Sequence, residues 1–217
     1  MIKQRLRLAV LAFPVLMFST DVHAGPLTIT LDTSPLSGTQ TLVFGLTNFD
    51  ASSNTLLLSD FAFDGGSAVA ASADCTLGGS FSGVGCSGDL TTGVTLEDLD
   101  PPAAFFVQQF EAGTSLSFVL DATNNFTGPV PDQFAMFVCD AALSTCYSDD
   151  ATGALLLLDL VGGSLSPASF VLFGASNEGL PAPVVTVTTT TPEPGTLWLF
   201  AAAAAAASRR RQSVRSR

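Results

Sequence analysis

Carboxylates are the side chains of this sequence with the most chemistry to offer. All of its 19 Asp and Glu residues except Asp21 and Glu193 lie between Gly25 and Thr191, a stretch with no Lys, Arg or His. The single histidine, His23, precedes that stretch. Nucleophilic catalysis of the Ser/His/Asp or Cys/His kind needs a base that titrates near neutral pH. The sequence therefore excludes this chemistry for the middle of the chain.

Carboxylate pairs are the remaining catalytic candidates, because two carboxyl groups suffice for glycoside hydrolysis. Asp60 and Asp64, four residues apart in one apolar run, would point to the same face of a strand. Other adjacent carboxylates are Glu97, Asp98, Asp100, Asp149 and Asp150. Since turns favour Asp in most proteins, we expect these residues to be solvated turn carboxylates and the protein not to be an enzyme.

Calcium is the metal that this residue set would suit, since it binds carboxylate and carbonyl oxygens from loops. The candidate ligands are Asp98, Asp100, Asp149 and Asp150. The sequence contains no regular Asp-x-Asp-x-Asp-Gly loop. It therefore predicts no cofactor, with calcium as the alternative.

Four cysteines indicate an oxidising destination. Their spacing favours two local disulfides, Cys75 to Cys86 and Cys139 to Cys146, and leaves the other two pairings open. Zinc is the rival interpretation, but the two-residue Cys spacings and the histidines that structural zinc sites use are missing.

Short apolar or alternating runs, separated by Gly, Asp, Asn, Ser and Pro, fill the middle of the chain. They lie at residues 27–31, 42–46, 56–58, 61–63, 104–107, 116–120, 134–138, 155–160 and 170–173. No helical period appears outside the two ends. The pattern predicts an all-β domain over residues 25–180, an antiparallel β-sandwich of jelly-roll type with a core of Phe side chains.

The negative charge limits the partners of this domain. The whole chain has a formal net charge of -11, and binding to nucleic acid or to an anionic membrane surface depends on Lys and Arg. Both are excluded as partners of the middle of the chain. Divalent cations and basic partners suit it better.

All eight Lys and Arg residues lie in the two ends of the chain, beside apolar runs. Residues 1–24 combine a basic start, an apolar stretch and small residues before position 25. This order predicts a secretory signal helix that signal peptidase removes between Ala24 and Gly25.

At the other end, Pro192, Glu193 and Pro194 precede a second apolar run, which is followed by Arg209, Arg210 and Arg211. This order over residues 192–217 resembles the PEP-CTERM sorting signal. The resemblance implies that an exosortase, a transpeptidase-like membrane enzyme, recognises the Pro-Glu-Pro motif, cuts near it and transfers the protein onward. The apolar run would enter the bilayer as a helix, and the arginines would stop transfer at the cytoplasmic face.

The predicted tail helix is short for a membrane span. Residues 196–208 would extend about 20 Å at roughly 1.5 Å per residue, against a hydrocarbon core of about 30 Å. The span is therefore marginal and would require snorkelling arginines and a thinned bilayer.

Residues 181–191 are rich in Pro and Thr, which predicts an extended linker between the domain and the sorting signal. The body also resembles a family of secreted proteins with PEP-CTERM tails. Residues 32–38, 110–118 and 131–134 carry that resemblance. The family has no established activity that the resemblance could imply.

Together these features predict an exported protein of the cell envelope, the outer surface or the extracellular matrix, with a transient stage in the inner membrane. We expect a structural or interaction role, with extracellular polysaccharide or other envelope proteins as partners. The alternatives are a calcium-assisted adhesin and a glycan-binding module.

Overall fold

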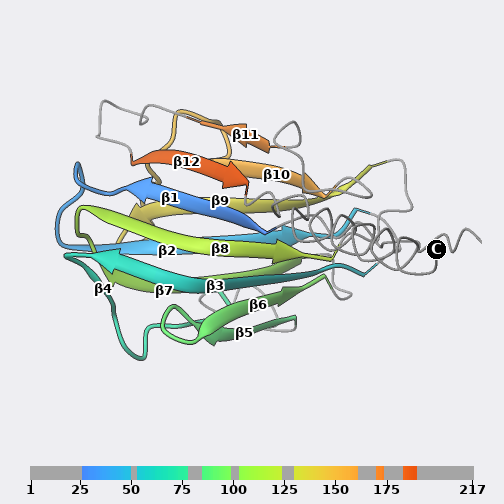
Figure 1. Cartoon of the computed structure of the whole chain (residues 1–217), viewed down its shortest axis with the longest axis horizontal. Helices are drawn as coiled ribbons and strands as arrows, with labels where there is room; N and C mark the ends of the chain where they lie inside the picture. Colours follow the sequence, from blue (N-terminus) through green and yellow to red (C-terminus); the bar gives the residue numbers. More distant parts are fainter. Residues whose placement is uncertain are drawn as a thin grey trace, which may run out of the picture.

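A computed structural model describes residues 26–49, 53–77, 85–98, 103–123, 130–160, 170–173 and 183–189. These segments form two antiparallel sheets packed face to face, without a helix (Figure 1). The predicted all-β sandwich is therefore confirmed. The predicted signal helix and tail helix lie outside these residues. None of the described segments contains a helix of the length and apolarity that crossing a membrane requires.

Each sheet has six strands. Sheet A has the order β12 (Val184–Thr189), β1 (Leu27–Asp32), β8 (Ser115–Ala122), β3 (Thr55–Asp64), β6 (Gly93–Glu97) and β5 (Cys86–Asp89). Sheet B has the order β11 (Phe170–Leu172), β10 (Leu156–Leu160), β9 (Asp132–Asp140), β2 (Thr39–Thr47), β7 (Ala103–Glu111) and β4 (Ser67–Ala68). From β1 to β5 the chain changes sheet at every connection, which gives the jelly-roll-like character expected from the sequence.

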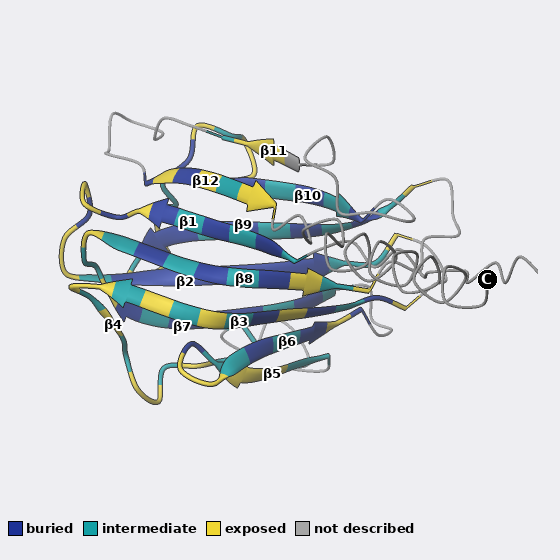
Figure 2. Cartoon of the chain, in the orientation of Figure 1, coloured by how far each residue is buried: buried dark blue, intermediate teal, exposed yellow. Residues whose placement is uncertain are grey.

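The core lies between the sheets and is built around Phe44. Alternate residues of β1, β8 and β9 are buried over most of each strand, whereas β2 is buried along nearly its whole length, so dark bands recur in Figure 2. The Phe44 ring, from sheet B, lies 5.3 Å from the Phe118 ring and 6.2 Å from the Phe61 ring of sheet A. Within its own sheet it contacts Phe106 at 6.0 Å and Phe134 at 5.9 Å. These rings join the two sheets at their centre.

The linker predicted at residues 181–191 is wrong for residues 184–189, which form strand β12. Six residue pairs place β12 antiparallel to β1, from Leu27 opposite Thr189 to Asp32 opposite Val184. The physical reason is the alternation of valine and threonine, both β-branched residues that favour strands. Val185 is buried in the core, so the segment belongs to the domain although its composition is that of a linker. The domain thus extends past residue 180.

Strands β4, β5 and β6 are also absent from the sequence prediction. The β5 sequence, Cys-Ser-Gly-Asp, has no apolar alternation, and its pairing with β6 in a hairpin makes it a strand. β6 does alternate, because Val94 and Leu96 are buried and Thr95 is not. The apolar alternation of β6 is hard to recognise in the sequence, because the strand is short and begins with Gly93.

The turns at the end of the sandwich opposite Leu27 and Thr189 pack on one another. Thr33 Oγ1 donates to the carbonyl of Gly113 at 2.9 Å, and the Thr114 N–H donates to the carbonyl of Asp64 at 2.7 Å. A Cβ on Gly113 would lie 2.1 Å from that Asp64 oxygen, so no other residue fits there. We call residues 33–38, 65–66 and 112–114 the turn cluster.

The position of Phe44 predicts a large loss of stability on truncation. The substitution Phe44→Ala should lower the free energy of unfolding by about 3–5 kcal/mol, since it empties a fully buried site between two sheets. Urea denaturation of the domain measures this. The matched control is Phe49→Ala at a side chain that is 53% exposed, where a change within about 0.5 kcal/mol is expected. Equal effects at the two positions would contradict the assignment of the core.

Candidate functional site

The candidate sorting and processing residues lie beyond the two ends of the described domain. These are Ala24, Gly25, Pro192, Glu193, Pro194, Arg209, Arg210 and Arg211. The structure nevertheless fixes where the chain leaves the domain towards them. Leu27, which begins β1, and Thr189, which ends β12, lie opposite each other. In Figure 1, β1 begins and β12 ends towards the right-hand end of the sandwich. The segments that carry the two predicted cleavage positions therefore leave from one corner of sheet A.

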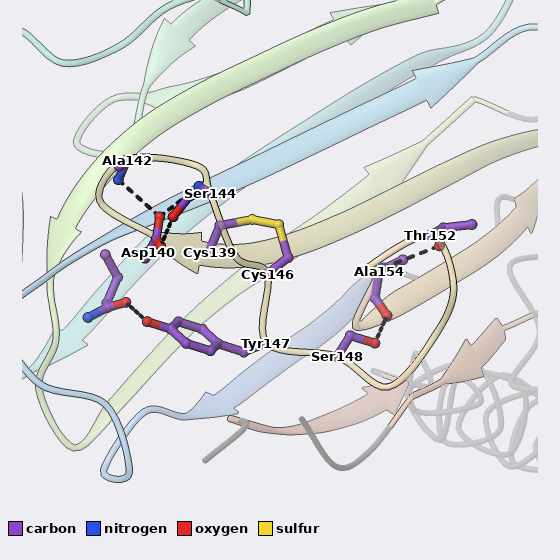
Figure 3. Close-up of a disulfide and its surroundings, with 10 residues drawn as sticks. Cys139, Asp140, Ala142, Ser144, Cys146, Tyr147, Ser148, Thr152 and Ala154 are labelled. Carbon is purple, nitrogen blue, oxygen red and sulfur yellow. Dashed lines mark hydrogen bonds between the residues drawn. A yellow bond between two sulfur atoms is a disulfide. The ribbon is translucent and has the colours of Figure 1, made fainter. Parts of the chain in front are cut away.

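The two predicted disulfides are present in the structure, so the local pairing is confirmed. Cys75 bonds Cys86 with 5.6 Å between the Cα atoms, and Cys139 bonds Cys146. The first bond links the two sheets, because Asp74 bridges to Val107 of sheet B and Cys86 begins β5 of sheet A. The second closes the turn after β9 (Figure 3). No free cysteine is present among the four.

Several described aspartates accept hydrogen bonds from a nearby Ser or Thr and from backbone N–H groups. Four of them, at turns or strand ends, have a lowered pKa: Asp32, Asp89, Asp140 and Asp150. In Figure 3 the Asp140 carboxylate accepts from the N–H of Ala142 and from Ser144. Hydrogen bonds to the ionised form lower a carboxyl pKa, and the side-chain donor is the largest cause at all four positions. These carboxylates stabilise turns.

A polar network holds two carboxylates at the end of the sandwich from which the termini leave. The Asn54 N–H donates to Asp98 Oδ1 at 2.6 Å, and the Asn54 side-chain amide donates to Asp132 Oδ2 at 2.6 Å. The Phe49 N–H donates to Asp132 Oδ1 at 2.7 Å. Both carboxylate residues are only 1% exposed. Asn54, just before β3, thus uses neutral donors to join the carboxylates of Asp98, just after β6, and Asp132, at the start of β9.

The structure does not bring together the three candidate calcium ligands that it describes, Asp98, Asp149 and Asp150. Asp98 lies in the buried network near the start of β9, whereas Asp149 and Asp150 lie in the loop that follows Cys146. Asp150 accepts from the N–H and hydroxyl of Thr152 in its own turn. Asp100 lies outside the described residues. Among those that are described, no three His, Cys, Asp or Glu side chains form a group that could hold a metal ion.

Asp60 and Asp64 are both exposed on β3, and Phe61 and Phe63, which alternate with them, pack against the core. The register of β3 against β8 shifts between Ser59 and Ala62, and Asp60 has a φ of 53°. The extra residue is a β-bulge, so Asp60 lies at an irregular position of the strand. The Asp64 carboxylate accepts from Thr114 at 2.6 Å and supports the turn cluster.

Asn54 and Asp132 were not among the predicted site residues. Asp132 is in phase with the buried residues Phe134, Met136 and Val138 of β9, so the strand alternation puts its carboxylate inside the sandwich. That phase was the signal available in the sequence. Asn54 offers no such signal, because its role depends on two residues 44 and 78 positions away.

Comparison with known proteins finds one match, at the tail. Residues 190–212 match the family model described as the PEP-CTERM protein-sorting motif. No curated protein and no solved structure match the chain. The predicted sorting motif is therefore confirmed, and the chain has the tail of an exosortase substrate. This motif implies export and sorting to the cell surface by an exosortase.

The buried network predicts that Asp132 stabilises the fold. The substitution Asp132→Ala should lower the free energy of unfolding by about 2–4 kcal/mol, because it leaves the Phe49 N–H and the Asn54 amide without their acceptor in the interior. Chemical denaturation measures the change. The control is Asp159→Ala, which removes a half-buried hydrogen bond from Gln133 and should cost about 1 kcal/mol. A smaller loss of unfolding free energy for Asp132→Ala than for Asp159→Ala would contradict the prediction.

The β5–β6 turn predicts an acid dependence of stability. Hydrogen bonds from the Thr91 hydroxyl, and from the N–H groups of Thr91 and Thr92, lower the pKa of Asp89 from 3.8 to about 2. Because the folded pKa lies below the unfolded one, the stabilisation is complete above pH 3.8 and is lost as the pH falls towards 2. The difference in melting temperature between wild type and Asp89→Ala should therefore shrink across that interval. A difference that stays constant from neutral pH to pH 2 would contradict it.

Proposed function

We propose that the protein is a surface or matrix protein whose sandwich domain has a structural or interaction role, and that exosortase processing delivers it there. The observation that carries the proposal is the sorting motif at residues 190–212, directly after the last strand of the domain. The motif supports export and surface sorting. The role of the body, its final location and its partners belong to the proposal.

The use of the described carboxylates supports a role without catalysis. Those at the turns are engaged by neighbouring Ser and Thr side chains, and Asp98 and Asp132 are engaged in the buried network. Such arrangements stabilise a scaffold, since each carboxylate is held in place by hydrogen bonds from neutral donors. Partners compatible with the domain are neutral or basic polymers of the cell surface, such as extracellular polysaccharide or other envelope proteins, because the domain has no cation with which to bind an anionic one.

The test removes the two prolines of the motif. The double substitution Pro192→Ala and Pro194→Ala should leave the uncut precursor in the inner membrane, because prolines hold a recognition segment extended. The measurement is the intact mass of the protein recovered from the envelope and the medium of its native host. Wild type is expected to lack the terminal arginines, and the variant is expected to retain them. Normal release of the double variant would overturn the proposed processing.

As a matched control, Pro181→Ala changes a proline outside the motif and should be processed like wild type. Its release also shows that a proline substitution near the tail does not by itself block export.

A further inference from the structure

Strand β12 connects the folded domain to the sorting motif almost directly. It ends at Thr189, and residues 190 and 191 alone separate it from Pro192. At roughly 3.4 Å per residue, three residue steps allow Pro192 to reach at most about 10 Å from Thr189. A domain of this size has a radius of gyration of about 15 Å. With β12 docked, the motif is therefore closer to the domain than the domain is wide.

Among the described strands, β12 pairs on one side only. It lies at the edge of sheet A, beside β1. Val185 is its one buried side chain, Val187 is half-buried, and Val184 is 62% exposed. The neighbouring β1 instead pairs on both sides and buries Leu27, Ile29 and Leu31. Edge segments with few buried contacts open most readily in folded proteins.

Release of β12 would lengthen the connection to the motif. The preceding strand, β11, ends at Leu172, and the N–H of Phe173 still donates to the carbonyl of Leu155. From Phe173 to Pro192 there are 192 − 173 = 19 residue steps, which extend at most about 65 Å. The rest of sheet A keeps its order, because β1 remains paired with β8.

We propose that β12 is a retractable tether for the sorting motif: docked on β1 it limits how far Pro192 can extend from the domain, and its release lets the motif enter a membrane enzyme. This rests on the proposed function, since it assumes that an exosortase acts on the tail. The equilibrium between docked and released β12 then limits the rate at which the tail is processed. The partner that competes with β1 for this segment is the processing enzyme.

The test locks β12 in place from the solvent side. Thr28 and Thr188 lie directly opposite each other, and both point away from the core. Opposed residues of antiparallel strands are about 4.5–5.5 Å apart between Cα atoms, which suits a disulfide. The variant combines Thr28→Cys with Thr188→Cys, and each single substitution is a control. The measurement, in the native host, is the fraction of chains that retain residues 209–211 by intact mass over time.

We expect tail removal in the double variant to slow by roughly tenfold or more, because the enzyme acts on the open population. The two single variants should be processed like wild type. A further variant adds to the locked chain, after Thr191, a Gly/Ser segment as long as residues 174–189. It should restore processing, because it supplies the reach without opening β12.

Each result distinguishes the proposals. Processing of the locked chain at the wild-type rate would overturn the tether, and so would failure of the inserted segment to restore processing. If wild type itself keeps its arginines, the proposed function fails, whatever the locked chain does. A raised melting temperature, together with peptide mapping without reduction that finds positions 28 and 188 in one cross-linked peptide, shows that the engineered disulfide has formed in a folded protein.

Discussion

The described body of this protein has to satisfy its carboxylates without any cationic side chain, since no Lys, Arg or His lies between Pro26 and Thr189. The side-chain and backbone donors that this stretch itself supplies to the ionised groups are therefore all neutral. The turns show how the chain meets this constraint: an Asp is followed by Ser or Thr two or four residues later, as in Asp89 with Thr91 and Asp140 with Ser144. The hydroxyl and backbone N–H donors fix the turn and the charge together.

The same constraint explains the buried network. Burying two carboxylates without cations is costly unless each receives hydrogen bonds. Asn54 supplies donors to both, one from its backbone and one from its side chain. Because Asp98 follows β6 and Asp132 begins β9, this residue ties sheet A to sheet B at the end where the termini leave. The turn cluster links strands of both sheets at the opposite end, and the Phe44 cluster joins them in the middle.

How far the sequence predicts this structure depends on how local the determining contacts are. The alternation of Leu27, Ile29 and Leu31 specifies β1 by itself, and close spacing is enough to favour the Cys75 to Cys86 bond. The sequence predicts a linker at β12 because its Pro- and Thr-rich surroundings resemble one. The decisive contact is the pairing with β1, whose first residue lies 184 − 27 = 157 positions before the first residue of β12. The bulge at Asp60 depends likewise on pairing with β8, which no local pattern shows. The sorting signal could be predicted without knowledge of the fold, because it is defined by the linear order of its residues.

The antiparallel pairing of the first and last strands gives the molecule two unlike poles. The chain enters and leaves at the pole with the buried acidic network, and the turn cluster forms the other (Figure 1). A tail held in a membrane would turn the acidic pole towards the bilayer and the turn cluster outward, where Gly113 and Thr33 close the turns tightly. A neighbouring cell or polymer would then meet a compact set of short turns first, and the long axis of the sandwich would set how far the protein projects from its support.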